Sequence, residues 1–257
     1  MQTTQDSVSI ILPVTNSEDS LTECLKALLK QTHKDIEIIA IDDNSSDQSY
    51  KILRRFRRMD KRLIISQNVK KYGLSITLNR ALKQARGKYI AFMNPNDTCT
   101  QDRIKRQLLY LKRHPKTVAV GTQTVFTDEK HKRVGKSNFP TEHTAISKSL
   151  LGGKAMQLES SMINRHLLPK DLLKFEHQAF PILFRTLFLK MLPYGSFANI
   201  NDFLYLRYRH DSLHLEEIKT KIMPHVLLWT RSWFVHDNRP SLQSLLYPLN
   251  NKLKSSL

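Results

Sequence analysis

The chain has few of the residues that build disulfide frameworks, long linkers or membrane spans. Its 257 residues include two cysteines, which is too few for a disulfide framework or a cysteine metal cluster. Seven glycines and ten prolines argue against long low-complexity linkers. No apolar run is long enough to cross a bilayer, and no basic segment precedes the first apolar run, as it would in a secretory signal. We therefore expect a globular cytoplasmic protein.

Acidic residues are also scarce. The 23 Asp and Glu residues stand against 41 Lys and Arg, which gives a formal net charge of +18. A field of this sign attracts nucleic acid, anionic lipid or phosphorylated substrates, but the sequence has no zinc-finger spacing and no RNA-recognition signature. The densest basic run, Lys51 to Arg62, carries apolar residues at helical spacing. It therefore predicts the solvated face of an amphipathic helix rather than a nucleic-acid patch.

Apolar, β-branched runs alternate with amphipathic segments through the first half of the chain. The predicted strands are residues 8–14, 36–42, 62–66, 88–93 and 117–126, and the predicted helices are residues 17–31, 51–62, 74–85 and 100–114. Gly87 is typical of the residue that follows a helix end. Strands that alternate with helices imply β–α–β units and a mostly parallel sheet.

Small polar and acidic residues follow three of the predicted strands. They are Thr15-Asn16, Asp42-Asp43-Asn44 and Asn94 to Asp97. Because ligands bind beyond the carboxyl ends of such strands, a nucleotide would fit there. A glycine-rich phosphate loop would not hold it, since neither GxGxxG nor GxxxxGK[ST] occurs in the sequence.

The order of these motifs resembles the family 2 glycosyltransferases, which have the GT-A fold. The resemblance covers roughly the first half of the chain, and a weaker similarity to the family's closing strand pair follows at residues 194–213. The motifs that carry it are Pro13, the Asp42-Asp43-x-Ser-x-Asp47 loop, Gly73-Leu74 before Leu78-Asn79, and Gly87-Lys88-Tyr89. The resemblance implies an α/β GT-A domain, a mostly parallel sheet flanked by helices, over residues 1–212. Residues 213–257 would form a helical C-terminal appendage.

The resemblance also implies a nucleotide site. Pro13, Thr15 and Asn16 would help to hold the nucleotide, and Asp43, with Asp42 beside it, would accept a hydrogen bond from a uracil-type base. The donor would then be a UDP-type nucleotide sugar, and the acceptor a sugar or a lipid-linked molecule. The structural alternative for Asp43 is a turn or cap residue.

The family's Asp-X-Asp motif, which binds a divalent metal and the sugar nucleotide, corresponds here to Asn94-Pro95-Asn96. Mn²⁺ and Mg²⁺ prefer carboxylate and phosphate oxygens, and an amide adds no charge. Asp97 is the only carboxylate left in this segment. It would be either a single metal ligand, or a residue that ends the strand and caps the next helix.

The family's general base normally belongs to an acidic pair that precedes an arginine in a helix. Counting back from Arg185 places Gln178 and Ala179 at those positions. Glu176 and His177 lie just upstream and would substitute as catalytic residues if the helix starts differently. The alternative for Glu176 is a first-turn residue that the helix dipole favours.

Two basic segments near the C-terminus allow two interpretations each. The first segment contains Arg207, Arg209 and His210. These residues would lie near the diphosphate of the donor, or alternatively would belong to a basic strand at the surface. In the tail, Val226, Trp229 and Trp233 have helical spacing. This helix would lie in the interface of an anionic membrane, at its inner face, or would pack on the body of the domain.

Two functions are consistent with this sequence. The first is transfer of a sugar from a nucleotide diphosphate to a hydroxyl, in cell-surface polysaccharide or glycoconjugate synthesis. The second is a catalytically degenerate protein that keeps the fold to bind an anionic polymer, a membrane or a protein partner, because the metal and base positions are altered together.

Overall fold

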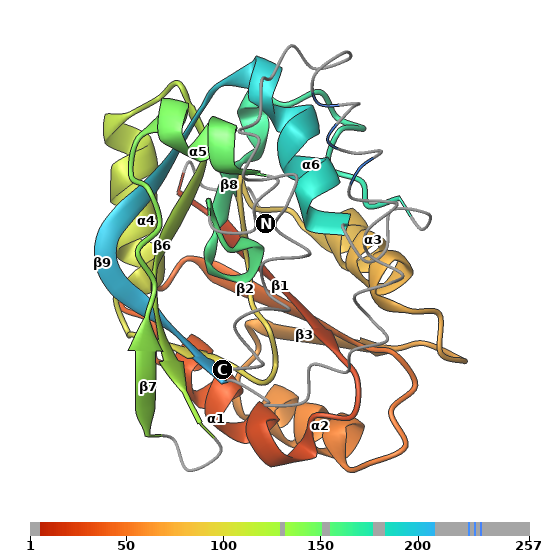
Figure 1. Ribbon diagram of the computed structural model, residues 1–257. Coiled ribbons are helices and arrows are strands. Elements are labelled where there is room, and N and C mark those ends of the chain that lie inside the picture. Colours follow the sequence, from red (N-terminus) through yellow and green to blue (C-terminus); the bar gives the residue numbers. More distant parts are fainter. Residues whose placement is uncertain are drawn as a thin grey trace.

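One mixed sheet organises the described part of the chain (Figure 1). The computed structural model describes residues 6–128, 132–150, 155–176 and 183–208, together with Val226, Trp229 and Ser232. The strands are β1 (Val8–Val14), β2 (Ile36–Asp42), β3 (Leu63–Gln67), β4 (Tyr89–Phe92), β5 (Thr98–Cys99), β6 (Thr117–Thr127), β7 (Arg133–Lys136), β8 (Met162–Asn164) and β9 (Ser196–Tyr208). The helices are α1 (Glu18–Leu29), α2 (Ser49–Met59), α3 (Leu74–Gln84), α4 (Arg103–Arg113), α5 (His143–Ser149) and α6 (Leu183–Met191).

The first four strands form a parallel half of the sheet. Their order is β3-β2-β1-β4, and β1 pairs in parallel with both neighbours, Val8 opposite Ile36 on one side and Tyr89 on the other. The sheet continues as β8-β6-β9-β5, where β6 and β9 pair in parallel and the remaining pairings are antiparallel. The α/β architecture of the GT-A type expected from the sequence is confirmed.

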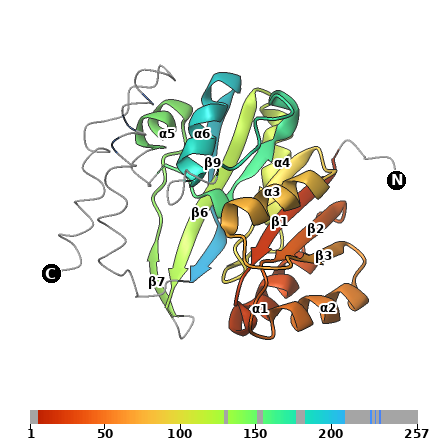
Figure 2. The same ribbon diagram turned by 90° about the vertical axis from the view of Figure 1, so that its right-hand side faces the viewer.

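Side chains of β1 point alternately to the two faces of the sheet, and a layer of helices covers each face. Val8, Ile10, Leu12 and Val14 belong to the core cluster that α1, α2 and α4 cover, whereas Ile11 belongs to the cluster under α3, α5 and α6. Figure 2 shows β1 to β3 between α3 on one side and α1 and α2 on the other. Both faces of the strand are buried, which is why its sequence reads as a continuous apolar run.

Two details differ from the expectation. Residues 196–208 form one long strand, β9, instead of a closing strand pair, and shifts in its register with β6 absorb the irregularity. Gly87 does not end α3, because the helix stops at Gln84. A Cβ at Gly87 would lie 2.6 Å from the backbone nitrogen of Ser9, so close approach to β1 explains this glycine.

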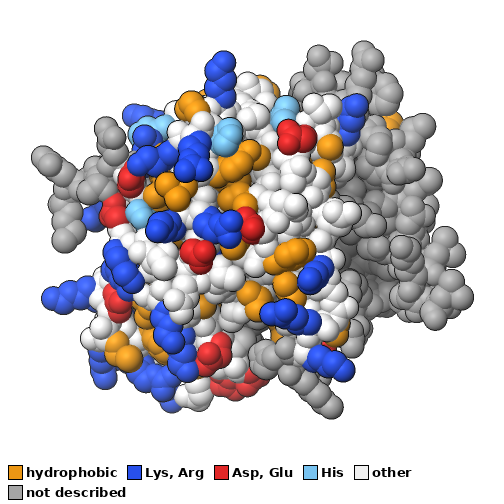
Figure 3. Space-filling view, turned by 90° about the vertical axis from the view of Figure 1, so that its left-hand side faces the viewer, with side chains coloured by type: hydrophobic (Ala, Val, Ile, Leu, Met, Phe, Trp, Pro, Cys, Tyr) orange, Lys and Arg blue, Asp and Glu red, His pale blue; other side chains and the backbone are white. Residues whose placement is uncertain are grey.

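The predicted boundary at residue 212 and most of the appendage lie outside the described residues, as does Trp233. Trp229 packs against the hydrophobic core, and Ser232 is buried. In the described ranges, no helix is long and apolar enough to span a bilayer. Figure 3 shows Lys and Arg side chains spread over one face of the molecule with acidic side chains between them, as expected for solvated charge.

Candidate nucleotide site at the carboxyl edge of the sheet

Three loops lie side by side at the carboxyl edge of the parallel strands. The amide of Asp43, just after β2, donates a 2.8 Å hydrogen bond to the carbonyl of Val14 at the end of β1. The amide of Met93, just after β4, donates a 3.1 Å hydrogen bond to the carbonyl of Ile11 in β1. The polar segments that follow these strands are therefore brought together, as the chain order predicts.

Asn16 joins the first loop to the second. Its φ of 44° lies in the left-handed region, which asparagine tolerates better than most residues. Its side-chain oxygen accepts a 2.9 Å hydrogen bond from the amide of Ser46, and its own amide donates to the Ser45 hydroxyl at 3.0 Å. Thr15 is exposed next to it, and Pro13 is half-buried within β1.

Asp42 holds the turn that follows β2. Its carboxylate accepts hydrogen bonds from the amide of Ser45 at 3.0 Å, from the Ser45 hydroxyl at 2.5 Å and from the Gln67 side chain at 3.0 Å. The side chain is fully buried. Asp42 therefore fixes the conformation of this loop through buried hydrogen bonds.

Asp43 is surrounded by hydrogen-bond donors. Asn68 at 2.7 Å and the amide of Tyr72 at 2.9 Å donate to one oxygen, and the amide of Gly73 donates to the other at 2.8 Å. Burial alone would raise the pKa of Asp43, but the hydrogen bonds from Tyr72, Asn68 and Gly73 outweigh it and lower the pKa. The carboxylate is therefore ionised, fixed in orientation and 1% exposed.

Gly73 makes this arrangement possible. Its φ of +88° is a conformation that side chains with a Cβ rarely adopt, and it turns the amides of Tyr72 and Gly73 toward Asp43. Asp43 therefore also holds the loop that precedes α3.

Asp47 connects the starts of two helices. One of its oxygens accepts a 2.9 Å hydrogen bond from the amide of Glu18 in α1, and the other accepts one from the amide of Ser49 in α2, also at 2.9 Å. Glu18 in turn accepts a 2.8 Å hydrogen bond from the amide of Gln48. The last Asp of the loop motif therefore caps both helix N-termini and fixes the loop between them. Ser17 is at the N-cap position of α1, but its side chain makes no capping bond.

The two amides after β4 are engaged within the protein. The side-chain oxygen of Asn94 accepts a 2.9 Å hydrogen bond from the amide of Asn96, which closes a turn typical of asparagine. The side-chain oxygen of Asn96 accepts a 2.7 Å hydrogen bond from the hydroxyl of Ser20 in α1. Asn94 and Asn96 thus maintain the loop geometry without contributing charge.

Asp97 points into the protein. The Tyr205 hydroxyl donates to one oxygen at 2.7 Å and the amide of Tyr208 to the other at 2.9 Å, and the side chain is 3% exposed. Burial raises the pKa of Asp97, the hydrogen bonds from Tyr205 and Tyr208 and the charge of Arg207 lower it, and the charge of Glu159 raises it. The resulting pKa is about 7.

The side-chain oxygens of Asn94, Asn96 and Asp97 do not suit a divalent cation as ligands. Both oxygens of Asp97 already accept hydrogen bonds, and so do the side-chain oxygens of Asn94 and Asn96. Within the ranges that the structure describes, no three His, Cys, Asp or Glu residues are grouped closely enough to hold a metal ion. Hard cations need several oxygens and benefit from carboxylate charge, so this segment does not fit a resident Mn²⁺ or Mg²⁺.

A cavity of about 330 Å³ opens beside the loops. Asn16 and Asn96 line it from the loops after β1 and β4, and Thr127, Leu206 and Tyr208 line it from β6 and β9. Its size is at the lower end of the range for small-molecule sites. Two of the predicted nucleotide-binding residues therefore face one cavity.

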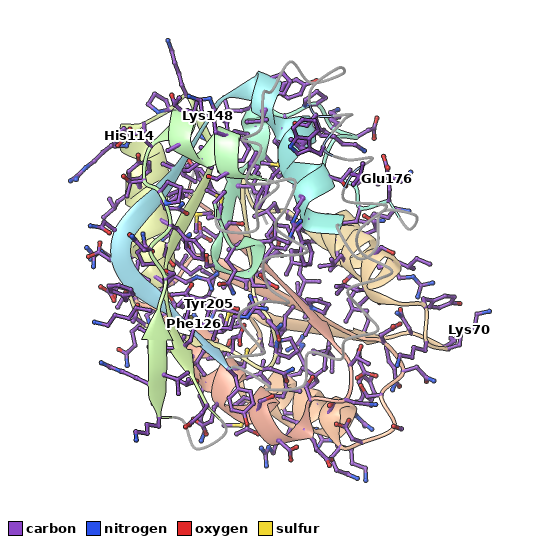
Figure 4. All side chains as sticks on the ribbon, in the orientation of Figure 1. Lys70, His114, Phe126, Lys148, Glu176 and Tyr205 are labelled. Atoms are coloured by element: carbon purple, nitrogen blue, oxygen red, sulfur yellow. The ribbon has the colours of Figure 1, made fainter. Side chains whose placement is uncertain are left out.

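The predicted catalytic and diphosphate residues are only partly described. Glu176 pairs with Lys190 of α6 and lies at the periphery, well away from Tyr205 (Figure 4). Arg207 belongs to β9, and its charge acts on Asp97. His177, Arg209 and His210 lie outside the described residues, as do the positions Gln178 and Ala179.

The sequence reasoning missed residues that orient the site. Asn68 links Asp43 to Arg80, whose guanidinium donates to its side-chain oxygen and lies 4.5 Å from the centre of the Tyr72 ring. Tyr205 was not singled out, although it anchors Asp97. A polar residue directly after β3 was the available signal for Asn68, whereas nothing local marks a tyrosine inside an apolar strand.

Comparison with known proteins places the chain in a family. The profile of glycosyl transferase family 2 matches residues 9–190, which is well over half of the chain. Together with the α/β fold and the three converging loops, this match shows that the chain belongs to glycosyl transferase family 2.

Two curated relatives show the range of similarity. The chain is 34% identical over 117 residues to the poly(ribitol-phosphate) beta-glucosyltransferase of Bacillus spizizenii, covering 44% of the chain and 18% of that protein. It is 35% identical over 105 residues to the UDP-Glc:alpha-D-GlcNAc-diphosphoundecaprenol beta-1,3-glucosyltransferase WfaP of Escherichia coli, covering 41% of each. The chain thus matches less than half the length of either relative.

Solved structures agree in fold. S. aureus TarS 1-349 in complex with UDP-GlcNAc superposes with a TM-score of 0.68 at 18% identity, covering 97% of this chain and 81% of that one. The mannosyltransferase PcManGT from Pyrobaculum calidifontis, in complex with GDP-Man and Mn²⁺, gives 0.67 at 13% identity, covering 97% and 74%. At these identities the likeness concerns the fold alone.

Proposed function

We propose that the chain transfers a glycosyl group from a nucleoside diphosphate sugar to a hydroxyl of an acceptor, in the synthesis of a cell-surface polysaccharide or glycoconjugate. The observation that carries the proposal is the convergence of three polar loops on one edge of the sheet, one of which carries the ionised, fixed carboxylate of Asp43. Membership of glycosyl transferase family 2 supports it.

The donor is a UDP-type nucleotide sugar. An ionised carboxylate suits recognition of the imide N–H of a uracil ring through a charge-assisted hydrogen bond, and the 1% exposed Asp43 reaches the ring when the loop at Tyr72 and Gly73 moves aside. Pro13, Thr15 and Asn16 flank the nucleotide on one side, and Asn94 and Asn96 flank it on the other. Both the complex of TarS with UDP-GlcNAc and the UDP-Glc named for WfaP support this class of donor.

Basic side chains neutralise the leaving diphosphate. Arg207 is in β9, and its charge acts on Asp97, which belongs to the same loop as Asn94 and Asn96. Arg209 and His210, which follow it in sequence, complete the cationic group. PcManGT holds Mn²⁺, but the donors of Asn94, Asn96 and Asp97 do not fit such an ion here, so charge compensation rests on protein cations.

The acceptor hydroxyl attacks the anomeric carbon and displaces the nucleoside diphosphate. The new carbon–oxygen bond forms as the bond to the diphosphate breaks, and a basic side chain takes the hydroxyl proton. Glu176 and His177 are our candidates for that base. Glu176 forms an ion pair with Lys190, so it must exchange this partner before it accepts a proton.

The acceptor is a sugar or a lipid-linked molecule, and the protein works in the cytoplasm at the inner face of an anionic membrane. The name of WfaP, whose acceptor is a diphosphoundecaprenol-linked sugar, supports a lipid-linked acceptor. The net charge of +18 supports attraction to an anionic surface.

A screen of UDP-sugars tests this function. The full chain is incubated with each UDP-sugar, with and without acceptor lipid or oligosaccharide, and release of UDP is measured. Release that requires Asp43 is expected with at least one donor. Binding of UDP without hydrolysis or transfer of any sugar would instead identify a catalytically degenerate protein that uses the fold for binding.

A further inference from the structure

A second, larger cavity lies at the opposite edge of the sheet. Its volume is about 830 Å³, within the range of small-molecule sites. It is enclosed by the last turns of α3, by the residues that lead into β4, and by residues 165–174, which follow β8. Figure 1 shows this segment after β8 running beside α3. Since α3 is antiparallel to the strands, its C-terminal end lies away from the loops around Asp43.

Basic side chains dominate this cavity. Six line it, against the single carboxylate of Asp171: Lys83, Arg86, Arg165, His166, Lys170 and Lys174. Among the described residues, none of the six lies within 4.0 Å of a carboxylate oxygen in an ion pair, and neither does Asp171 with a cation. The cavity therefore holds a concentration of positive charge that the described part of the protein does not neutralise.

His166 lies among these positive charges. Burial lowers its pKa, and the neighbouring charges of Lys88 and Arg165 lower it further. Burial is the larger cause of the lowered pKa, and the two positive charges add to it. An anion in the cavity would relieve the same repulsion.

The walls of the cavity are held in place. The side chain of Asn79 in α3 donates a 2.7 Å hydrogen bond to the carbonyl of Phe175 and accepts one of 2.8 Å from its amide. Arg165 donates a 2.8 Å hydrogen bond to the carbonyl of Ala85 at the end of α3. The segment after β8 is thus fixed to α3 at both ends of the cavity, which makes the cavity preformed.

Part of the lining is apolar. Leu82 and Leu173 are half-buried and offer carbon surface between the charged side chains, with the buried Ile90 and Leu168 behind them. A bare inorganic ion would leave this surface unused. A ligand with an anionic group and an organic body would use both parts of the cavity.

We propose that this cavity binds the phosphate of an organic phosphate ester, a sugar phosphate or polyol phosphate, at a site separate from the nucleotide loops. Phosphate suits a mixed set of Lys and Arg donors, because guanidinium groups bind its oxygens in pairs and ammonium groups act as point charges. The proposal goes beyond the transferase function and does not depend on it.

Calorimetry with the full chain tests the proposal. Glucose 1-phosphate and glycerol 3-phosphate are the probes, glucose is the neutral control, and each titration is run with and without saturating UDP. We expect each phosphate ester to bind with the same affinity with and without UDP. Glucose should not bind. If the chain fails to bind UDP, the titrations without it still test the cavity, so the two proposals fail separately.

A matched pair of variants locates the binding. The triple variant Lys83→Gln, Lys170→Gln and Lys174→Gln removes three exposed cations of the cavity, and we expect about tenfold weaker binding, since each exposed charge contributes modestly. The control carries the same charge change at three exposed lysines elsewhere: Lys51→Gln, Lys61→Gln and Lys105→Gln. It should change affinity less than twofold.

Four results would overturn the proposal. Equal weakening by both triple variants would assign the binding to the overall charge of the molecule, and displacement of the probe by UDP would assign it to the nucleotide loops. Equal binding of glucose would mean that the phosphate is not recognised. Binding of phosphatidylglycerol vesicles without binding of either ester would make the cavity part of a membrane surface.

Discussion

The hydroxyl of Tyr205 donates a 2.7 Å hydrogen bond to the carboxylate of Asp97, and this bond joins β9 to the loop after β4. The two residues are separated by 108 positions in the chain. The bond fixes the segment that carries Asn94 and Asn96 against the long strand that leads to Arg207. It also determines how Asp97 responds to pH.

Stability should depend on the titration of Asp97. Burial raises its pKa to about 7, above its ordinary value of 3.8, so the folded state binds this proton more tightly than the unfolded state. The contribution of Asp97 to the free energy of unfolding is therefore greatest below about pH 4 and falls by roughly 4 kcal/mol as the pH rises to 7. The measurement is chemical denaturation of the parent and Asp97→Asn across this range.

The difference between parent and Asp97→Asn isolates this group, because the other titrations are common to both. The difference should move in favour of the variant as pH rises. Tyr205→Phe removes a hydrogen bond that lowers the pKa of Asp97 and should shift the transition to higher pH. A difference that does not change with pH would contradict the account of Asp97.

Asp43→Asn should weaken UDP binding by about 1.5–3 kcal/mol, the size expected for a hydrogen bond to a charged group. The variant should also lose roughly 2 kcal/mol of stability, because the amides of Tyr72 and Gly73 then face a partly donating group. Calorimetry with UDP and urea denaturation measure the two effects.

Asp60→Asn is the matched control for Asp43. Its carboxylate also accepts hydrogen bonds, from Arg62, and also has a lowered pKa, but it directly follows α2, before β3 begins, and lies away from the three loops. It should lose stability with unchanged UDP affinity. If Asp43→Asn behaves in the same way, Asp43 is a turn residue and does not read the base.

Restoring acids at Asn94 and Asn96 should create metal affinity. Both side-chain oxygens already accept hydrogen bonds, from the Asn96 amide and the Ser20 hydroxyl, and an aspartate can accept the same bonds. The double variant Asn94→Asp, Asn96→Asp should therefore keep the loop and bind Mn²⁺ more tightly in the presence of UDP, because hard cations respond to ligand charge. Tight Mn²⁺ binding by the parent protein, measured by calorimetry, would show that its own donors suffice.

Trp229→Ala should lower the free energy of unfolding by about 2 kcal/mol, because a partly buried aromatic side chain leaves the core. Tyr194→Ala, which truncates an exposed aromatic residue, should cost much less. Binding to anionic vesicles is measured on the same proteins. Unchanged stability combined with loss of vesicle binding would instead assign Trp229 to a membrane interface.

Much of the fold is predictable from local pattern. The runs that became β1 and β2 are apolar on both faces, and the stripe of Leu21, Cys24, Leu25 and Leu28 on α1 has helical spacing, so each segment indicates its own structure. The rule that ligands bind at the carboxyl edge then identified the three loops. These expectations needed only neighbouring residues and chain order.

The direction in which a side chain points was not predictable. Asp97 follows a strand like any ligand-binding acid, but it turns inward because Tyr205 and the amide of Tyr208, over a hundred residues later, supply its partners. The cations of the larger cavity are likewise scattered from Lys83 to Lys174 and carry no local motif. Such groups exist only through tertiary contacts.

The central claim is that the loops around Asp43 bind the donor nucleotide. Calorimetric titration of the full chain with UDP, with and without Mn²⁺ and with GDP and ADP for comparison, tests it most directly. We predict that UDP binds without added metal, binds more tightly than GDP or ADP, and loses affinity in Asp43→Asn. Absence of binding for all three nucleotides, with and without Mn²⁺, would contradict the account.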